Sequence, residues 1–229
     1  DMVAAAAPSI GHFNTVGTAS SMHSVAEALG MSLPGCAAIP APYRERGQIS
    51  YETGKRIVKM VFEDLTPSKI MTKKAFENAI VVASAIGGSS NCPPHLSAIA
   101  KHMGVKIKLN DWQKLGHDIP LLVNCKPAGE FLMEKFYRGG GVPAVMRELI
   151  KQKKLHTSLM TVSGKTLGQN LKNKVNIDTD VIKSFDNPIV KNAGFIVMRG
   201  NFFNSAIMKT SVISEEFRER YLSDPDKPN

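Results

Sequence analysis

The sequence predicts a helix-rich α/β layer domain followed by the start of a second, β-rich domain. Up to about residue 155, segments with the helical spacing of apolar residues alternate with short apolar runs that suit strands. Beyond that point, β-like runs separated by turn residues take over. We therefore expect part of an α/β domain over residues 1–155, a basic connecting region over 156–190 and the beginning of a β-rich domain over 191–229.

The first two helices are predicted from their apolar faces. Residues 20–29 carry apolar side chains three and four positions apart, and a glycine follows where a left-handed cap ends a helix. The prolines after it favour an ordered loop, and a second helix is expected from about Arg46 to Leu65. Its predicted buried face comprises Ile57, Met60, Val61 and Leu65.

Two further helices are predicted on either side of a glycine pair. Thr72 is the expected N-cap of the third helix, which ends at Gly87–Gly88. Because proline suits the first turn of a helix, two consecutive prolines predict a fourth helix over 92–103. The buried stripe of the third helix is expected to contain Phe76, Ala79, Ile80, Ala83 and Ile86.

The remaining predicted elements are short. Strands are expected at 105–109 and 120–124, and helices near 129–137 and 142–152, separated by three glycines. The later β-like runs are LMTVSG, GFIVMRG and SAIMKTSVI, and NFFNS is expected to connect the last two.

More than half of the net charge of +9 is concentrated in one stretch. Residues 147–191 hold nine basic groups, eight of them lysine, against four acidic groups. No nucleic-acid-binding motif accompanies them, so a solvated face is the expected interpretation. Nucleic acid is not expected as a partner and remains the weakest alternative.

Other features favour neither a membrane protein nor a secreted protein. No apolar run approaches the ~18 residues of a membrane span, and no signal segment opens the chain. The three cysteines are too few and too widely spaced for a disulfide framework. We therefore expect an intracellular protein, in the cytoplasm or alternatively in a mitochondrion. The first residue is Asp1, which suggests a piece of a longer protein.

The spacing of histidines and cysteines gives no complete metal centre. No two of the six histidines lie four residues apart, and no CxxC motif occurs. A single pair, Cys92 and His95, lies within four residues, which is weak evidence for ligands. The acidic residues also do not single out an acid/base pair.

A glycine-containing segment, AIGGSSN, is the strongest local candidate for ligand binding. Its glycines allow a ligand to approach the backbone, and its amides and hydroxyls precede a helix, which suits a carboxylate or a phosphate. The same residues equally suit a left-handed cap on one helix followed by an N-cap on the next. Both interpretations stay open for Gly87, Gly88, Ser89, Ser90 and Asn91. The segment GHFNTVGTASS is of similar character.

Long blocks of the sequence resemble the dihydroxy-acid and phosphogluconate dehydratase family. The blocks are GHFNTVGTASSMHSVAEALGMSLPGCAAIPAPYRERG, NAIVVASAIGGSSN, DIPLLVN, GGGVPAVMREL and GNFFNSAIMKTSVIS. Together they extend over nearly all of 10–225, and they are most similar to the branch containing L-arabinonate and related pentonate dehydratases. The resemblance implies a lyase that removes water from a 2,3-dihydroxy acid to give a 2-keto acid. It also implies an α/β domain followed by a β-barrel-like domain, and a homo-oligomer.

The resemblance further implies two inorganic cofactors and shows a departure from the family. The family uses an iron–sulfur cluster, commonly two-iron two-sulfur in this branch, and a magnesium ion. One cluster cysteine lies in a GHCNT-type motif, and Phe13 stands at the matching position here, followed by the cluster-adjacent Asn14 and Thr15. The resemblance assigns the other cluster and magnesium ligands to segments before residue 1, and the catalytic serine to a segment beyond residue 229. Cys36, Cys92 and Cys125 match none of the ligand motifs.

Two functional hypotheses follow for a chain with these features. The first is a central segment of a sugar-acid dehydratase that binds neither cluster nor magnesium and is inactive alone. The second is a non-catalytic relic that acts as an anion-binding or dimerising module.

Overall fold

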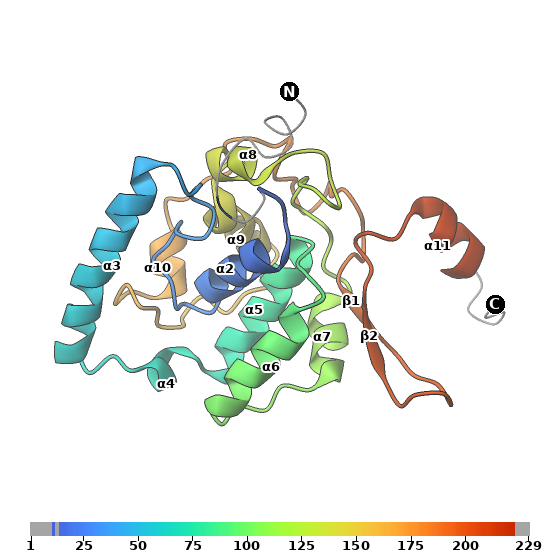
Figure 1. Cartoon of the computed structure of the whole chain (residues 1–229), viewed down its shortest axis with the longest axis horizontal. Helices are drawn as coiled ribbons and strands as arrows, with labels where there is room; N and C mark the ends of the chain where they lie inside the picture. The colour runs from blue at the N-terminus through green and yellow to red at the C-terminus, as the bar shows by residue number, and fades with distance from the viewer. Residues whose placement is uncertain (1–10, 12–13, 223–229) are drawn as a thin grey trace.

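The computed structural model describes residue 11 and residues 14–222. Helices surround a central helix, and a two-stranded hairpin lies at one side (Figure 1). The helices are α2 (Thr18–Ala28), α3 (Arg44–Phe62), α4 (Pro67–Ile70), α5 (Lys73–Ala85), α6 (Cys92–His102), α7 (Leu109–Gly116), α8 (Met133–Arg138), α9 (Gly141–Lys151), α10 (Leu167–Leu171) and α11 (Glu215–Leu222). The strands are β1 (Phe195–Met198) and β2 (Ala206–Lys209).

Helix α5 is the centre of the fold, as its apolar stripe predicts. Ten of its 13 residues are buried, including the whole predicted stripe within the helix, and it packs against α2, α6, α7 and α9. The buried Asn78 is satisfied because its side-chain amide exchanges two hydrogen bonds, of 3.0 and 2.8 Å, with the backbone of His156. A helix buried on nearly all sides therefore keeps its polar groups paired.

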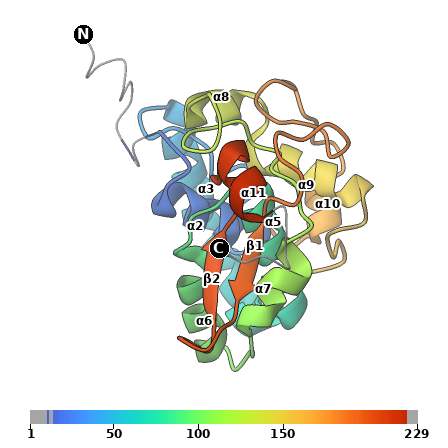
Figure 2. The same ribbon diagram turned by 90° about the vertical axis from the view of Figure 1, so that its right-hand side faces the viewer.

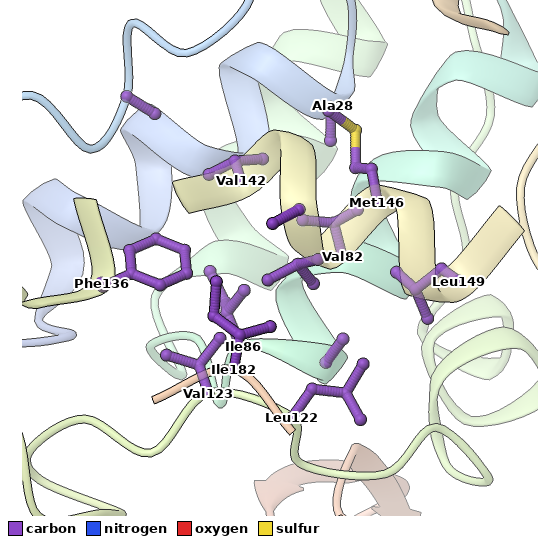
Figure 3. Packing of buried hydrophobic residues seen from close by; sticks show 14 of the residues in the cluster. Ala28, Val82, Ile86, Leu122, Val123, Phe136, Val142, Met146, Leu149 and Ile182 are labelled. Carbon is purple, nitrogen blue, oxygen red and sulfur yellow. The ribbon is translucent and has the colours of Figure 1, made fainter. Parts of the chain in front are cut away.

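Two hydrophobic clusters share α5. One joins α5 to α8, α9 and the extended segment 119–125, with Val82, Leu122 and Met146 among its members (Figure 3). The other joins α5 to α6, α7 and β1, where the rings of Trp112 and Phe195 meet edge to face, 4.9 Å apart. The hairpin is therefore packed onto the helical body through Phe195.

The sheet is smaller than the sequence predicts. Strands β1 and β2 pair antiparallel in a register that places Phe195 opposite Lys209, and they form the predicted hairpin around NFFNS (Figure 2). The segment 120–124 is extended but contributes only isolated bridges, among them Leu121 with Val190. Over residues 14–222 the helix-rich prediction is confirmed, while this single strand pair does not support a barrel-like second domain.

The strand predicted at 105–109 is wrong. Residues 105–108 have no regular structure, and α7 begins at Leu109. The backbone N–H of Lys108 donates to the carboxylate of Asp111 at 2.8 Å, which stabilises the first turn of this helix. The alternation of apolar residues still reflects which side chains face the core, because Val105 and Ile107 pack against it without pairing in a sheet.

The predicted buried face of α3 is also largely wrong. Only Met60 of this helix is buried, whereas Ile57 is 55% and Val61 73% exposed. The helix stands at the edge of the molecule (Figure 1), so its apolar face is not covered by the described residues. Although α3 is 19 residues long, neither it nor any other helix within 14–222 is apolar enough to cross a membrane.

Candidate functional site

The glycine pair after α5 forms a left-handed helix cap. Gly87 has a φ of +63°, and the N–H groups of Gly87 and Gly88 donate to the carbonyls of Ser84 and Ala83 at 3.1 and 2.7 Å. This pairing is the Schellman arrangement that ends many helices. A Cβ at position 87 would lie 2.8 Å from Leu121 Cδ1, so glycine is required there by both backbone and space.

The loop after this cap is hydrogen-bonded to the first turns of α2. The N–H of Ser89 donates to Ser21 Oγ at 2.9 Å, and Ser89 Oγ lies 3.0 Å from Thr18 Oγ1. The side-chain amide of Asn91 donates to Thr18 Oγ1 at 2.8 Å instead of capping α6. The structure therefore joins the two polar segments that the sequence singled out, and we call Thr18, Ser21, Ser89 and Asn91 the hydroxyl junction.

Most donors of the predicted anion-binding loop are already used within the protein. The backbone N–H groups of Gly87, Gly88 and Ser89 donate as described above, and the N–H of Asn91 donates to Ser89 Oγ at 3.1 Å. On the other side of the loop, Lys209 Nζ donates to the carbonyl of Gly87 at 2.6 Å. Ser90 is exposed and keeps its amide and hydroxyl available among the described residues. Anion binding at residues 87–91 remains a prediction that rests on Ser90.

The two cluster-adjacent residues lie just before α2 and are firmly held. Asn14 is only 6% exposed and has a φ of +56°, a conformation that asparagine tolerates better than most residues. Its Oδ1 accepts from the N–H of Glu134 at 2.9 Å, and its carbonyl accepts from the N–H of Met133 at 2.9 Å. The carbonyl of Thr15 accepts from Ser20 Oγ at 2.5 Å. Phe13 lies outside the described residues.

A cavity of about 460 Å³ opens beside Asn14. Its walls include Ala19 and His23 from α2, Ile39 from the loop after α2, and Arg46 from α3. Ala19 and His23 lie on a different face of α2 from Thr18 and Ser21, because successive helical residues are turned by about 100°. The cavity is therefore formed by a different part of α2 from the hydroxyl junction.

Glu27 holds the loop that forms one wall of this cavity. Its two carboxylate oxygens accept from the N–H groups of Gly35 and Ala37 at 2.6 and 2.9 Å. Burial raises the pKa of Glu27 to about 7, while the two backbone hydrogen bonds and Lys174 oppose the rise. The sequence presented Glu27 as one carboxylate among several, and only its position opposite the loop distinguishes it.

The cysteines of the chain do not fit an iron–sulfur cluster. Burial raises the thiol pKa of Cys92 to about 11 and that of Cys125 to about 12. Cys36 Sγ lies 3.5 Å from an Arg46 nitrogen. Within the described residues, no three His, Cys, Asp or Glu side chains are grouped to hold a metal ion.

Comparison with known protein families gives one clear match. The sequence pattern described as "Dihydroxy-acid/6-phosphogluconate dehydratase N-terminal" matches residues 1–170. The matched region contains α2 to α9, the hydroxyl junction and the cavity beside Asn14.

Individual relatives are dehydratases of hydroxylated acids. A D-xylonate dehydratase of Caulobacter vibrioides is 56% identical over 225 residues, which are 98% of this chain and 38% of that protein. An L-arabinonate dehydratase of Rhizobium leguminosarum is 46% identical over 190 residues, covering 82% of this chain and 33% of the relative. A dihydroxy-acid dehydratase of Acetivibrio thermocellus is 42% identical over 212 residues, covering 92% and 38%. The chain spans less than two fifths of the length of these relatives.

Proposed function

The chain belongs to the dihydroxy-acid/6-phosphogluconate dehydratase family, and we propose that it contributes to a sugar-acid dehydratase. Such an enzyme takes a proton from C2 of a 2,3-dihydroxy acid and expels the C3 hydroxyl as water. The resulting enol becomes a 2-keto acid. The observation that carries the proposal is the 56% identity to a D-xylonate dehydratase over a segment that encloses a ligand-sized cavity.

The part proposed for this chain is to hold the acid rather than the inorganic cofactors. In the family an iron–sulfur cluster and magnesium supply Lewis-acid chemistry at the departing hydroxyl. Within the described residues no three His, Cys, Asp or Glu side chains are grouped to hold a metal, and Phe13 stands where the resemblance places a ligand. The hydroxyl junction supports the acid-holding role by fixing the first turns of α2, and through them Asn14, at the wall of the cavity.

The wider organisation is part of the same proposal. We propose an α/β dehydratase domain over residues 1–155, a basic connection over 156–190 and the beginning of a β-barrel-like domain from 191. The hairpin of β1 and β2 supports a β-rich start, although it packs onto α7. A homo-oligomer in the cytoplasm is proposed from the family resemblance and from three cysteines that form no disulfide.

A chimera tests the proposed function. This chain, carrying Phe13→Cys, would replace the matching segment of the Caulobacter D-xylonate dehydratase, and formation of 2-keto acid would be measured with D-xylonate. We expect turnover, with less from a short-chain 2,3-dihydroxy acid. A folded chimera that reconstitutes a cluster but forms no 2-keto acid from any sugar acid would contradict the proposal.

The second candidate function is a non-catalytic anion-binding or dimerising module, which Phe13 favours. In this case Ser90, at the exposed tip of the 87–91 loop, would contact an anion such as phosphate. Calorimetric titration of the chain with phosphate tests it, with Ser90→Gly as the comparison variant. Absence of heat at millimolar phosphate would exclude the anion-binding form of this function.

A further inference from the structure

Asn14, which lines the cavity, has a buried side-chain amide nitrogen with no hydrogen-bond partner among the described residues. Asn14 Oδ1 accepts from the N–H of Glu134, which fixes the orientation of the side-chain amide and leaves Nδ2 on its other side. Nδ2 is buried and makes no hydrogen bond with residue 11 or with residues 14–222. Because buried polar groups are nearly always paired, an unpaired donor on a residue that lines the cavity favours a ligand acceptor.

The same cavity contains a guanidinium group that has no carboxylate partner among the described residues. Arg46 donates from Nη2 to the carbonyl of Ile39 and from Nη1 to Cys36 Sγ at 3.5 Å. A guanidinium carries five N–H donors, so these contacts leave others unused. Arg44, two residues earlier on α3, instead points to solvent and lies 3.6 Å from Glu45.

The size and the chemistry of the cavity match one class of ligand. A volume of about 460 Å³ is in the range of small-molecule sites. A guanidinium recognises a carboxylate with two parallel hydrogen bonds, and an amide N–H recognises a hydroxyl oxygen. The apolar walls, including Ile39, Pro40 and Met133, suit the carbon chain between these groups.

We propose that this cavity binds the hydroxylated carboxylic acid, with Arg46 holding its carboxylate and Asn14 Nδ2 donating to one of its hydroxyl oxygens. The identity of the acid rests on the proposed function. The roles of Arg46 and Asn14 rest on the geometry of the cavity. Arg46 is also a structural residue, because its bond to Ile39 holds the wall of the cavity. The test must therefore separate binding from folding.

The experiment is calorimetric titration of the 229-residue chain with D-xylonate. Xylitol has the same carbon chain and hydroxyls without the carboxylate, and inorganic phosphate is an anion without the carbon chain. We expect heat from D-xylonate, little from xylitol and little from phosphate. Equal binding of phosphate and D-xylonate would show a general anion site and overturn the proposal, as would absence of D-xylonate binding to the wild-type chain.

Three variants assign the contacts. Asn14→Asp keeps the acceptor for the Glu134 N–H and replaces the Nδ2 donor with a carboxylate oxygen that also repels an anion, so we expect at least about fivefold weaker binding at an unchanged fold. Arg46→Met is expected to weaken binding at least about tenfold, whereas the matched control Arg44→Met should stay within about twofold. Circular dichroism reports whether each variant folds. If Arg46→Met does not fold, Asn14→Asp alone tests the proposal. An unchanged affinity of Asn14→Asp for D-xylonate would overturn it.

This test is independent of turnover. If the chimera forms 2-keto acid but D-xylonate binding to the chain is insensitive to Asn14 and Arg46, the inference fails and the proposed function stands. If binding depends on both residues but the chimera carrying Phe13→Cys is inactive, the site stands and the proposed reaction fails.

Discussion

Single polar residues fix the loops around α2, and most of them act in ways that their sequence neighbours do not reveal. Thr72 and Asn91 occupy the N-cap positions that the sequence predicts, yet neither side chain caps its helix. Asn91 bonds to Thr18, which is 73 residues away along the chain. The preference of a residue for the N-cap position is local and can be predicted from the sequence. The hydrogen-bond partner of Asn91 depends instead on how α2 packs beside α6.

The buried carboxyl group of Glu27 predicts that the stability of the fold depends on pH. Its pKa in the folded state is about 7, above its usual value of 4.5, so the protonated form stabilises the fold. This contribution is fully present below pH 4.5 and is lost as the pH rises through about 7, by at most about 3 kcal/mol. We expect the free energy of unfolding to fall over this window in the wild-type chain and to be flatter in Glu27→Gln.

The measurement is urea unfolding at several pH values between 4.5 and 8. Glu52→Gln is the matched control, because Glu52 is exposed on α3 and its variant should keep the wild-type slope. An identical pH dependence in wild type and Glu27→Gln would show that Glu27 does not titrate abnormally.

At the scale of elements, the spacing of apolar residues predicted the buried face of the central helix α5 correctly. The same spacing gave a wrong buried face for α3, which lies at the edge of the molecule. The stripe of α5 is buried as predicted, because neighbours surround this helix. The apolar face of α3 is present in the sequence, but the described residues supply nothing to cover it. The alternation at 105–109 was ambiguous, and the Asp111 contact favours a helix that starts at Leu109.

The attachment of the hairpin to α7 gives a second prediction. Phe195→Ala should remove the edge-to-face contact with Trp112 and leave a cavity, which costs about 3–5 kcal/mol for a buried phenylalanine. Hydrogen exchange should show faster exchange in β1 and β2. The control Phe202→Ala, at a ring that is 93% exposed, should change stability by less than about 0.5 kcal/mol. Equal protection of the hairpin in both variants would contradict this role of Phe195.

At the scale of the whole molecule, the sequence predicted the family and the polar segments on either side of α2, but not the cavity beside Asn14. The two polar segments were identified and do meet at the hydroxyl junction. Arg46 was not identified as a site residue, because it reaches the cavity only through the path of the loop between α2 and α3. Glu27 could not be distinguished from the other carboxylates for the same reason, because its partners Gly35 and Ala37 lie on that loop. The position of such residues depends on contacts between segments that are distant in the sequence, and a local sequence pattern does not predict these contacts.

The uncovered face of α3 gives a third prediction. Tyr51, Val58, Val61 and Phe62 are exposed apolar side chains of α3, and exposed apolar surface of this kind promotes association. Light scattering should show self-association of the chain with rising concentration, and Val61→Lys with Phe62→Lys should reduce it. Met198→Lys on β1 tests whether unpaired strand edges contribute instead. A monomer at all concentrations would contradict this prediction.

This chain belongs to the dehydratase family, and we expect Phe13 to prevent it from binding a cluster. A phenyl ring cannot ligate iron, so the chimera that carries Phe13 should show no iron–sulfur absorbance and no 2-keto acid formation after anaerobic reconstitution. The same chimera with Phe13→Cys should recover both. The most direct measurement is therefore the visible absorbance of this pair of chimeras, read together with turnover of D-xylonate. Cluster absorbance with turnover while Phe13 is still present would show that Phe13 does not prevent cluster binding.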